Sequence, residues 1–329
     1  MADTAYTAGL TRPHWGGPNS DADIHLEVFE GSIDTAFVYN AFFRANSTFI
    51  PVNDRSNTAR IDRLGSVTIQ GRQSGVKLEA QRMKNDKLVV TVDTVTYART
   101  PIDFQDDWTA PDFLPAMGKN HGTEHAKLYD QCHIIQLQKS RKWLAPAHLK
   151  PAFYDGVEKT AELVANDKEA TANNIVNAHA DGVQVLIERD LGGSLSEFRT
   201  IVSPRVFNLL LNHEKLMNVQ FSSGNGDFAQ RRMAFLNGTP VIESARFPSA
   251  AITNHVLGEA FNVDADDIAC EVLIYHPAMS LVTVEAKAHT SNLWVDNENF
   301  ANVLDSYAMY TIGQRRPDTV IAVKLVDLV

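Results

Sequence analysis

The stretch "GRQSGVKLEAQRMKNDKLVV", residues 71–90, has the apolar spacing of a β-hairpin but no apolar face. Valine and leucine recur at strand-like intervals in two places, from Val76 to Leu78 and from Leu88 to Val90. Charged residues fill the positions between them: Lys77, Glu79, Arg82, Lys84 and Lys87. Because an isolated hairpin is at best marginally stable in water, either another chain covers this one or it is a solvated surface hairpin.

Basic side chains dominate the longer arm to which this stretch belongs. Between Arg60 and Lys87, seven residues are basic and three are acidic. The basic residues from the tip onward are Arg72, Lys77, Arg82, Lys84 and Lys87. The next segment, "PIDFQDDWTAPDF", carries Asp103, Asp106, Asp107 and Asp112 with no compensating base. The arm is therefore basic within an acidic protein, and an acidic run follows it directly.

Helical and strand-like patterns alternate on both sides of the arm. Residues 1–22 predict an irregular arm, 24–37 a short helix and 47–52 a strand. Residues 60–99 predict strand, turn and strand, with Gly71 and Gly75 on one side and the "KND" turn at 84–86 on the other. A long helix is expected within 122–144, followed by two helical patterns in 153–191, the second closed by Gly192 and Gly193.

The second half of the chain carries the strongest local signals. Ser203 and Pro204 follow a buried strand and predict the N-cap and first turn of a helix. Asn237-Gly238 predicts a hairpin within 232–248. Two long strands are expected in 303–326, on either side of Arg315, Arg316 and Pro317. Strands and helices do not alternate regularly as βαβ units, which favours an α+β fold.

Composition limits the class of protein. The chain has 329 residues, 44% of them hydrophobic, which is enough for one large core or two smaller ones. It has no apolar run long enough to cross a membrane, and its first residues lack a signal-peptide pattern, so we expect it in a cytoplasm. Cys132 and Cys270 are expected to be buried thiols. The net charge of -10 argues against a broad nucleic-acid-binding surface.

The sharpest enzymatic signal is "HGTEH", which matches an inverted zinc-protease pattern. In that interpretation His121 and His125 bind zinc and Glu124 acts as general base, making a zinc hydrolase an alternative function. The other interpretation is a polar helix N-terminus, because Gly122 interrupts the helix and nothing marks a third ligand. "SSGNGDF", residues 222–228, lacks the ending of a phosphate-binding loop. We therefore expect a structural or binding role, with no catalytic residue, no metal and no cofactor.

Two stretches near the end of the chain, "SYAMYTIG" and "RRPDTVIAVKLV", and the earlier "LNGTPVIESARFP" carry a family resemblance. The first two resemble the closing strands of the major capsid proteins of tailed bacteriophages, and the third resembles the axial-domain hairpin of the same family. The order of elements is similar to the Hong Kong 97 type capsid fold. "DIHLEVFEGSIDTAFVYNAFF" looks most like the start of the chains of short-tailed, podovirus-type phages.

The resemblance implies five regions. They are an N-terminal arm and helix (1–57), an extended loop (58–99), a peripheral domain with the spine helix (100–149), an axial domain (150–285) and a return to the peripheral-domain sheet (286–329). It also implies hexamers and pentamers of an icosahedral head with T=7 geometry, located in the virion and assembled in the host cytoplasm. No motif marks a covalent cross-link, so we expect a non-covalent shell.

The resemblance also implies partners. They are other copies of the chain, a separate scaffolding protein, a portal protein at one vertex, a decoration protein, and packaged double-stranded DNA held by weak non-specific contact; no membrane is involved. We predict that the basic arm of one subunit meets the acidic run of a neighbour. Arg315 and Arg316 either reach across a subunit boundary or form an ordinary charged turn. An encapsulin-like nanocompartment, which shares this fold, is the main alternative.

Overall fold

The computed structural model describes residues 37, 41–52, 56–105, 113–150, 152–191, 193, 195–217, 226–227, 231–233 and 235–327. The predicted N-terminal arm lies outside these residues, as does the predicted helix at 24–37 except for Phe37, which is helical. The chain forms two compact units. One comprises residues 1–44, 94–129 and 287–310, and the other comprises 45–93, 130–286 and 311–329.

A four-stranded sheet is built from strands far apart in the sequence. Its order is β1 (Thr48–Pro51), β12 (Leu281–Asp296), β13 (Ala301–Gln314) and β4 (Val95–Asp103). β1 pairs with β12 in parallel, and β13 pairs with β4 in antiparallel register. Buried and more exposed residues largely alternate along β4 and β13, so the part of the sheet that these two strands form has one covered face and one more open face.

The predicted long helix is present as α4 (Phe113–Lys139), and a 3-10 turn extends it to Lys142. Buried residues lie on every side of it between residues 121 and 140, so the helix lacks a single apolar stripe. Its buried polar side chains bond to the strands. Nε2 of His133 lies 2.7 Å from Oγ1 of Thr283, and Nε2 of Gln314 donates to the carbonyl of Gln136 at 3.1 Å.

A second, six-stranded sheet holds an extensive apolar cluster. Its order is β5 (Val157–Leu163), β14 (Ile321–Asp327), β11 (Cys270–Tyr275), β6 (Arg199–Val202), β10 (Thr239–Glu243) and β9 (Phe235–Leu236). Helices α5 (Lys168–Glu188) and α6 (Pro204–Leu210) contribute to the cluster. Gly182 brings α5 close to β14, because a Cβ there would lie 2.8 Å from Cγ2 of Ile321.

Local signals predicted several of these elements. Asp167 caps α5, and the side chain of Ser203 caps α6 by accepting from the backbone N–H of Val206. The Asn237-Gly238 turn joins β9 to β10, and both residues have positive φ, as a tight hairpin turn requires. Short elements complete the described chain: α7 (Glu214–Met217), α8 (Ala265–Ile268), β7 (Gly226–Asp227) and β8 (Arg232–Met233).

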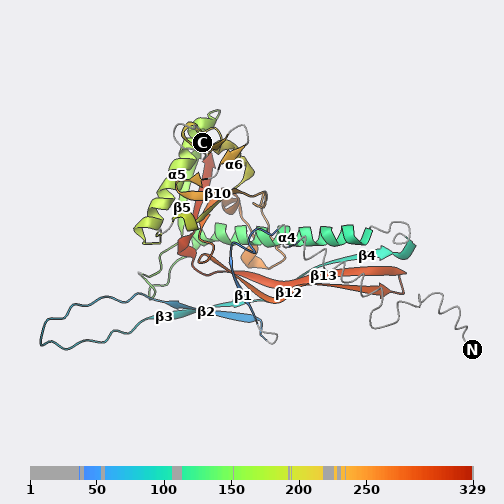
Figure 1. The fold of residues 1–329 in the computed structure, drawn as a ribbon, viewed down its shortest axis with the longest axis horizontal. Coiled ribbons are helices and arrows are strands. Elements are labelled where there is room, and N and C mark those ends of the chain that lie inside the picture. Colours follow the sequence, from blue (N-terminus) through green and yellow to red (C-terminus); the bar gives the residue numbers. More distant parts are fainter. Residues whose placement is uncertain are drawn as a thin grey trace, which may run out of the picture. The chain divides into compact units, whose positions relative to one another are not determined.

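The arm is a hairpin of β2 (Thr58–Leu64) and β3 (Asn85–Thr91) that continues into a long loop (Figure 1). The strand predicted near Val76–Leu78 is wrong, because residues 65–84 form no strand. The turn predicted at 84–86 is also wrong, because Asn85 and Asp86 belong to β3. The ladder ends where the N–H of Gly65 donates to the carbonyl of Lys84 at 2.8 Å.

Two further predictions need correction. The first helical pattern in 153–191 is wrong, because residues 157–163 form β5, an edge strand of the six-stranded sheet. The two closing strands are present, but β13 and β14 lie in different sheets. β14 pairs with β5 and β11, which supply the neighbours that bury its apolar side chains. None of the helices in the described residues is long and apolar enough to cross a membrane.

Candidate intersubunit contact surfaces

The free part of the arm, residues 65–84, has almost no contact with the rest of the described residues. Every residue from Ser66 to Lys84 is exposed. The exposed apolar side chains are Val67, Ile69, Val76, Leu78 and Met83; Ile69 is 92% exposed and Leu78 is 80% exposed. Isolated exposed apolar residues are common on protein surfaces, but a group of them on one extended segment indicates a contact surface.

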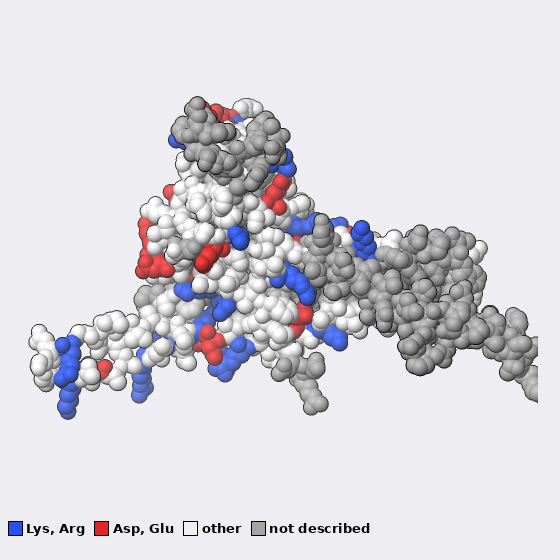
Figure 2. Space-filling model, viewed as in Figure 1, with Lys and Arg blue, Asp and Glu red and all other residues white. Residues whose placement is uncertain are grey.

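The predicted basic residues of the arm are exposed, as Figure 2 illustrates for this face of the molecule. Arg72 donates from Nε to the carbonyl of Val76 within the tip. Within the part of the chain that the structure describes, the side chains of Lys77, Arg82, Lys84 and Lys87 form no ion pair. The arm therefore presents positive charge that its own subunit does not neutralise.

The base of the arm, in contrast, packs on its own subunit. Ala59 and Val90 are buried. Gly313 of β13 makes this approach feasible, because a Cβ there would lie 2.7 Å from Cγ2 of Val90. Arg63 is also buried, and its guanidinium lies over the rings of Trp143 and Phe153, 5.5 and 6.0 Å from their centroids. In the sequence Arg63 is only one of the seven basic residues of the arm, and nothing close to it in the chain indicates this anchor.

The acidic run is only partly described. Asp103 is exposed at the end of β4, and its carboxylate accepts from the N–H of Gln105 at 2.8 Å. Asp106, Asp107 and Asp112 lie outside the described residues. The predicted contact between these carboxylates and the arm of a neighbour stays a prediction.

Arg315 and Arg316 both have partners within the chain. Nη1 of Arg315 donates to the carbonyl of Ala278 at 3.0 Å. Arg316 lies over the ring of Phe153 and pairs at 3.2 Å with Asp318, which is fully buried. Burial raises the pKa of Asp318, while the neighbouring Arg316 opposes that rise. An additional role of either arginine at a subunit boundary stays a prediction.

The open face formed by β4 and β13 carries an aromatic patch that was not expected from the sequence. Cross-strand neighbours on β4 and β13 are Tyr97 with Tyr307 and Val95 with Met309, and Tyr97 is 75% exposed. Beside them Arg99 pairs with Asp305, whose carboxylate also accepts from Nε1 of Trp294 at 3.0 Å. The signal was present in the alternation of "VTYARTPID" and "LDSYAMY".

The "HGTEH" histidines form a buried polar cluster instead of a zinc site. Nδ1 of His121 and Nε2 of His125 lie 3.0 and 3.1 Å from the hydroxyl of Ser306, and Nε2 of His121 lies 2.9 Å from that of Thr100. Glu124 pairs with Lys127. The ring of His289 packs edge-on against His125 at 4.6 Å. The described residues contain no group of three or more metal-binding side chains.

Burial controls the titration of this cluster. It lowers the pKa of His125 to about 4, and the neighbouring His121 adds to the shift. It also lowers the pKa of His289 to about 4, with smaller effects of His125, Arg44 and His121. The pKa of His121 is lowered by the same cause, against the attraction of Asp305. The imidazoles are therefore neutral near pH 7.

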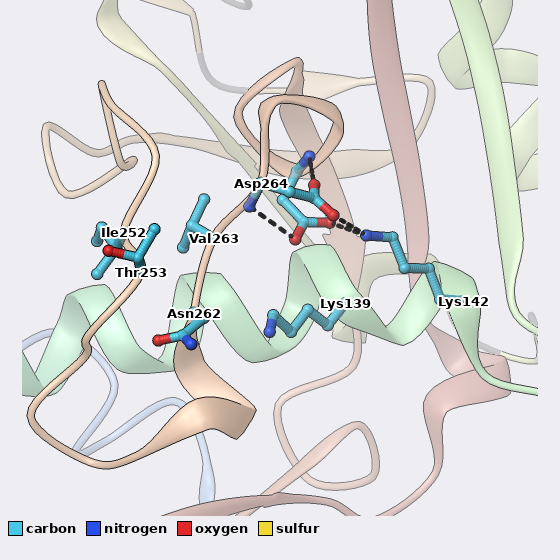
Figure 3. Close-up of a pocket in the computed structure, with 8 residues that line it drawn as sticks. Lys139, Lys142, Ile252, Thr253, Asn262, Val263 and Asp264 are labelled. Atoms are coloured by element: carbon cyan, nitrogen blue, oxygen red, sulfur yellow. Dashed lines mark hydrogen bonds and ion pairs between the residues drawn. The ribbon is translucent and has the colours of Figure 1, made fainter.

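A pocket of about 550 Å³ lies beside the C-terminal end of α4 (Figure 3). It is lined by Lys139, Lys142, Ile252, Thr253, Asn262, Val263, Asp264 and Asp267. Nζ of Lys142 pairs with Asp264 and Asp267 at 2.8 and 2.9 Å, and Nζ of Lys139 donates to the carbonyl of Ala260. Because these ammonium groups already have partners, we interpret the pocket as part of the structural framework.

Comparison with known proteins gives the family. No family model and no curated protein sequence matches this chain. The chain is similar to the asymmetric unit of the bacteriophage PhiM1 mature capsid, with 58% identity and a TM-score of 0.82 over 100% of both chains. The cyanophage P-SCSP1u capsid has 15% identity and a TM-score of 0.69, covering 88% of this chain and 89% of that one. The subunit of a virus-like particle from Pyrococcus furiosus is 11% identical to this chain, with a TM-score of 0.53; the match covers 91% of this chain and 99% of that one.

These likenesses define the fold as the Hong Kong 97 type of α+β shell protein, with its long spine helix. At 58% identity over its full length to the PhiM1 capsid subunit, the chain belongs to the major capsid proteins of tailed bacteriophages. It is a structural protein of an icosahedral head, assembles with copies of itself into capsomers, and lies in the shell of the virion. It is not an enzyme, so the zinc-hydrolase alternative is wrong.

The histidine cluster predicts how stability depends on pH. In the unfolded chain histidines titrate near pH 6.5, about 2 units above the folded-state pKa of His125 and His289. The unfolded state then binds more protons between about pH 4 and 6.5, so the free energy of unfolding falls as the pH falls through this window. We expect thermal denaturation of the unassembled chain to occur at a lower temperature at pH 5 than at pH 7.

A double variant, His125→Gln with His289→Gln, removes these two titrations. Its denaturation temperature should depend less on pH over the same window than that of the parent. An identical pH dependence in the two proteins would show that the cluster does not contribute.

Proposed function

We propose that the chain forms hexamers and pentamers in which each subunit lays its arm across the next, building a non-covalent shell around double-stranded DNA. The observation that carries this proposal is the free part of the arm, residues 65–84, where exposed apolar side chains have no cover in their own subunit. A ring of identical head-to-tail contacts closes on itself, so each subunit both gives an arm and receives one.

The apolar side chains supply the favourable term in this contact. Burying a large aliphatic side chain is worth roughly 1.5–3 kcal/mol, which is more than an exposed ion pair gives. The aromatic patch of Tyr97, Tyr307 and Trp294 is a suitable receiving surface, since it is open and lies on rigid strands. Charged residues of the arm then select the register of the contact.

The carboxylates that would select this register are Asp103, Asp106, Asp107 and Asp112. Asp103 ends β4, the strand that carries Tyr97, and the other three follow it in the sequence. We propose that Arg82 and Lys84 of an arm seated on that strand pair with these carboxylates. The proposed contact is thus apolar at its centre and charged at its edge, as stable interfaces commonly are.

The proposed regions follow the boundaries expected from the sequence, with one change. We propose an N-terminal arm and helix (1–57), an extended loop (58–99), a peripheral domain (100–149 with the return from 286) and an axial domain (150–285). We assign β14 to the axial domain as well, because it pairs with β5 and β11.

The further partners are proposed from the family resemblance. They are a separate scaffolding protein during assembly in the host cytoplasm, a portal protein at one vertex and a decoration protein on the outside. T=7 geometry and a short-tailed, podovirus-type parent phage belong to the same proposal. Electron microscopy of particles made from the chain with its scaffold gives the triangulation number directly, and a different number would contradict that part.

The apolar contact is tested by a double variant, Ile69→Ser with Leu78→Ser. Both side chains are exposed in the subunit, so its free energy of unfolding should change by less than about 0.5 kcal/mol. The yield of closed shells, measured by sedimentation and electron microscopy, should fall about ten-fold. Val256→Ser, which removes an exposed apolar side chain outside the arm, is the control. Normal shells from the double variant would contradict the proposed contact.

The charged contact is tested by reversing Arg82 and Lys84 to glutamate. The variant should remain folded and soluble but fail to close shells at moderate salt, because like charges then face each other. Changing Asp106 and Asp107 to lysine in the same chain should partly restore closure.

The matched control for this charge reversal is Lys168→Glu with Lys215→Glu, which makes the same change of charge on exposed residues away from the arm. Sedimentation at moderate and high salt separates the outcomes. If the arm variant forms shells as efficiently as the parent at both salt concentrations, the charges of the arm do not set the register.

Contact with the packaged DNA should be weak. The chain has 40 acidic and 30 basic residues, so few counterions would be released when it meets a duplex. We expect no tight complex in a filter-binding titration at physiological salt. Submicromolar affinity with a steep dependence on salt would contradict this part of the proposal.

A further inference from the structure

Arg63 occupies an unusual position at the base of the arm. It lies on β2, and only 8% of its surface is exposed although the neighbouring Leu64 is 56% exposed. Alternation along the strand turns Arg63 toward the body of the subunit, on the same face as Ala59. A buried guanidinium is costly to desolvate, so its contacts must be specific to be tolerated.

Two backbone carbonyls and two rings hold this guanidinium. Nη2 of Arg63 donates to the carbonyls of Gln314 and Arg315 at 2.9 and 3.1 Å. Trp143 and Phe153 lie against it, and Nε has no hydrogen-bond partner among the described residues. We call Arg63, Trp143, Phe153 and the two carbonyls the clasp. A planar guanidinium can stack and donate at the same time, which the ammonium of lysine does less well.

No carboxylate forms an ion pair with Arg63 in the described chain. The nearest negative charges, Asp86 and Asp318, act on it only at longer range, and burial lowers its pKa in spite of them. The contacts of Arg63 are therefore directional contacts with fixed points of the backbone. Such contacts constrain an angle more strongly than they add net stability.

The acceptors of the clasp are themselves fixed. The side chain of Gln314 donates to the carbonyl of Gln136 on α4, and the N–H of Arg315 donates to the carbonyl of Ser280 at 3.0 Å. Phe153 is also covered by Arg316 at 5.0 Å. Arg63 therefore connects the arm to a rigid frame made of the end of β13, the end of α4 and the segment around Phe153.

A small change of angle at this point has a large effect at the tip. Each limb of the free loop has about ten residues, which reach about 30 Å when extended. A tilt of about 10° at the base then moves the tip by about 5 Å, which is the spacing between neighbouring strands. An arm that varies by this much cannot keep one register on a neighbour.

We propose that Arg63 is a positioning residue for shell assembly, which fixes the direction in which the arm leaves its subunit. The inference rests on the proposed function of the arm as a contact with the next subunit. Arg63 does not touch that neighbour in this proposal; it acts through the arm, and the angle that it sets determines whether successive subunits close into a ring.

The direction of the arm can be measured in the unassembled chain. Spin labels at Leu64→Cys, the exposed last residue of β2, and at Asn177→Cys on α5 report the direction of the paired part of the arm as one distance, and both native cysteines are buried. The parent should give a narrow distance distribution, and Arg63→Ala a distribution about two-fold wider, since the arm pivots more freely. Arg63→Lys, which keeps the charge and one donor, should fall between them. A distribution in Arg63→Ala as narrow as in the parent overturns the proposal.

Arg231→Ala is the matched control. Arg231 also stacks on a ring, that of Phe207 at 5.2 Å, and pairs with Glu243, but it lies away from the arm. The variant Arg231→Ala should lower the free energy of unfolding without widening the distance distribution. If Arg63→Ala does not fold, Trp143→Leu removes one ring of the clasp and should widen the distribution in the same way; a narrow distribution in that variant also overturns the proposal.

Assembly is measured on the same variants. Arg63→Ala should give about ten-fold fewer closed shells than Arg231→Ala, and open or irregular particles in their place. Arg63→Lys should give an intermediate yield of closed shells. Suppose that Ile69→Ser with Leu78→Ser prevents shell closure, so that the arm is needed. Normal shells from Arg63→Ala, in spite of its wider distance distribution, would then overturn the role of Arg63. If that double variant also forms normal shells, the proposed function of the arm fails instead.

Discussion

The short connection from Gly313 to Arg316 is in contact with the arm, with α4 and with both sheets. It carries the chain from the end of β13 in one sheet towards β14 in the other. The N–H groups of Arg315 and Arg316 both donate to the carbonyl of Ser280, while Gly313 admits Val90 from the arm. Because the connection is hydrogen-bonded on several sides, it cannot shift without disturbing the arm, α4 and the buried Asp318 together.

Local chemistry made part of this fold predictable. The cap at Ser203 and the turn at Asn237-Gly238 depend on residues close together in the sequence, and they are where the sequence indicates. The long helix α4 is also present, but it begins at Phe113, nine residues before the expected start, and Gly122 does not interrupt it. β5 was misassigned because Val157, Ala161 and Val164 recur at helical spacing, although the segment is an edge strand with charged residues between them. Helical and strand periods cannot be separated well over so short a run.

The contact surfaces were predictable to a lesser extent. The exposure of Lys77, Arg82 and Lys84 follows from their charge alone. The burial of Arg63 does not, because its partners Trp143, Phe153 and Gln314 are 80 to 251 residues away in the sequence. The aromatic patch also depends on a long-range register, that of β4 against β13, although the alternation within each strand was visible. Pairings of this kind arise only when the chain folds.

The two cysteines give the shell protein a chemical property beyond its geometry. Cys132 and Cys270 are both fully buried, and they are the only cysteines in the chain. Burial raises the pKa of Cys270 to about 12 and that of Cys132 further, so neither thiol reaches the reactive thiolate form at neutral pH. A phage head forms inside a reducing cell and then persists in oxidising surroundings. Neither thiol of the folded subunit is therefore available to form a disulfide in either environment.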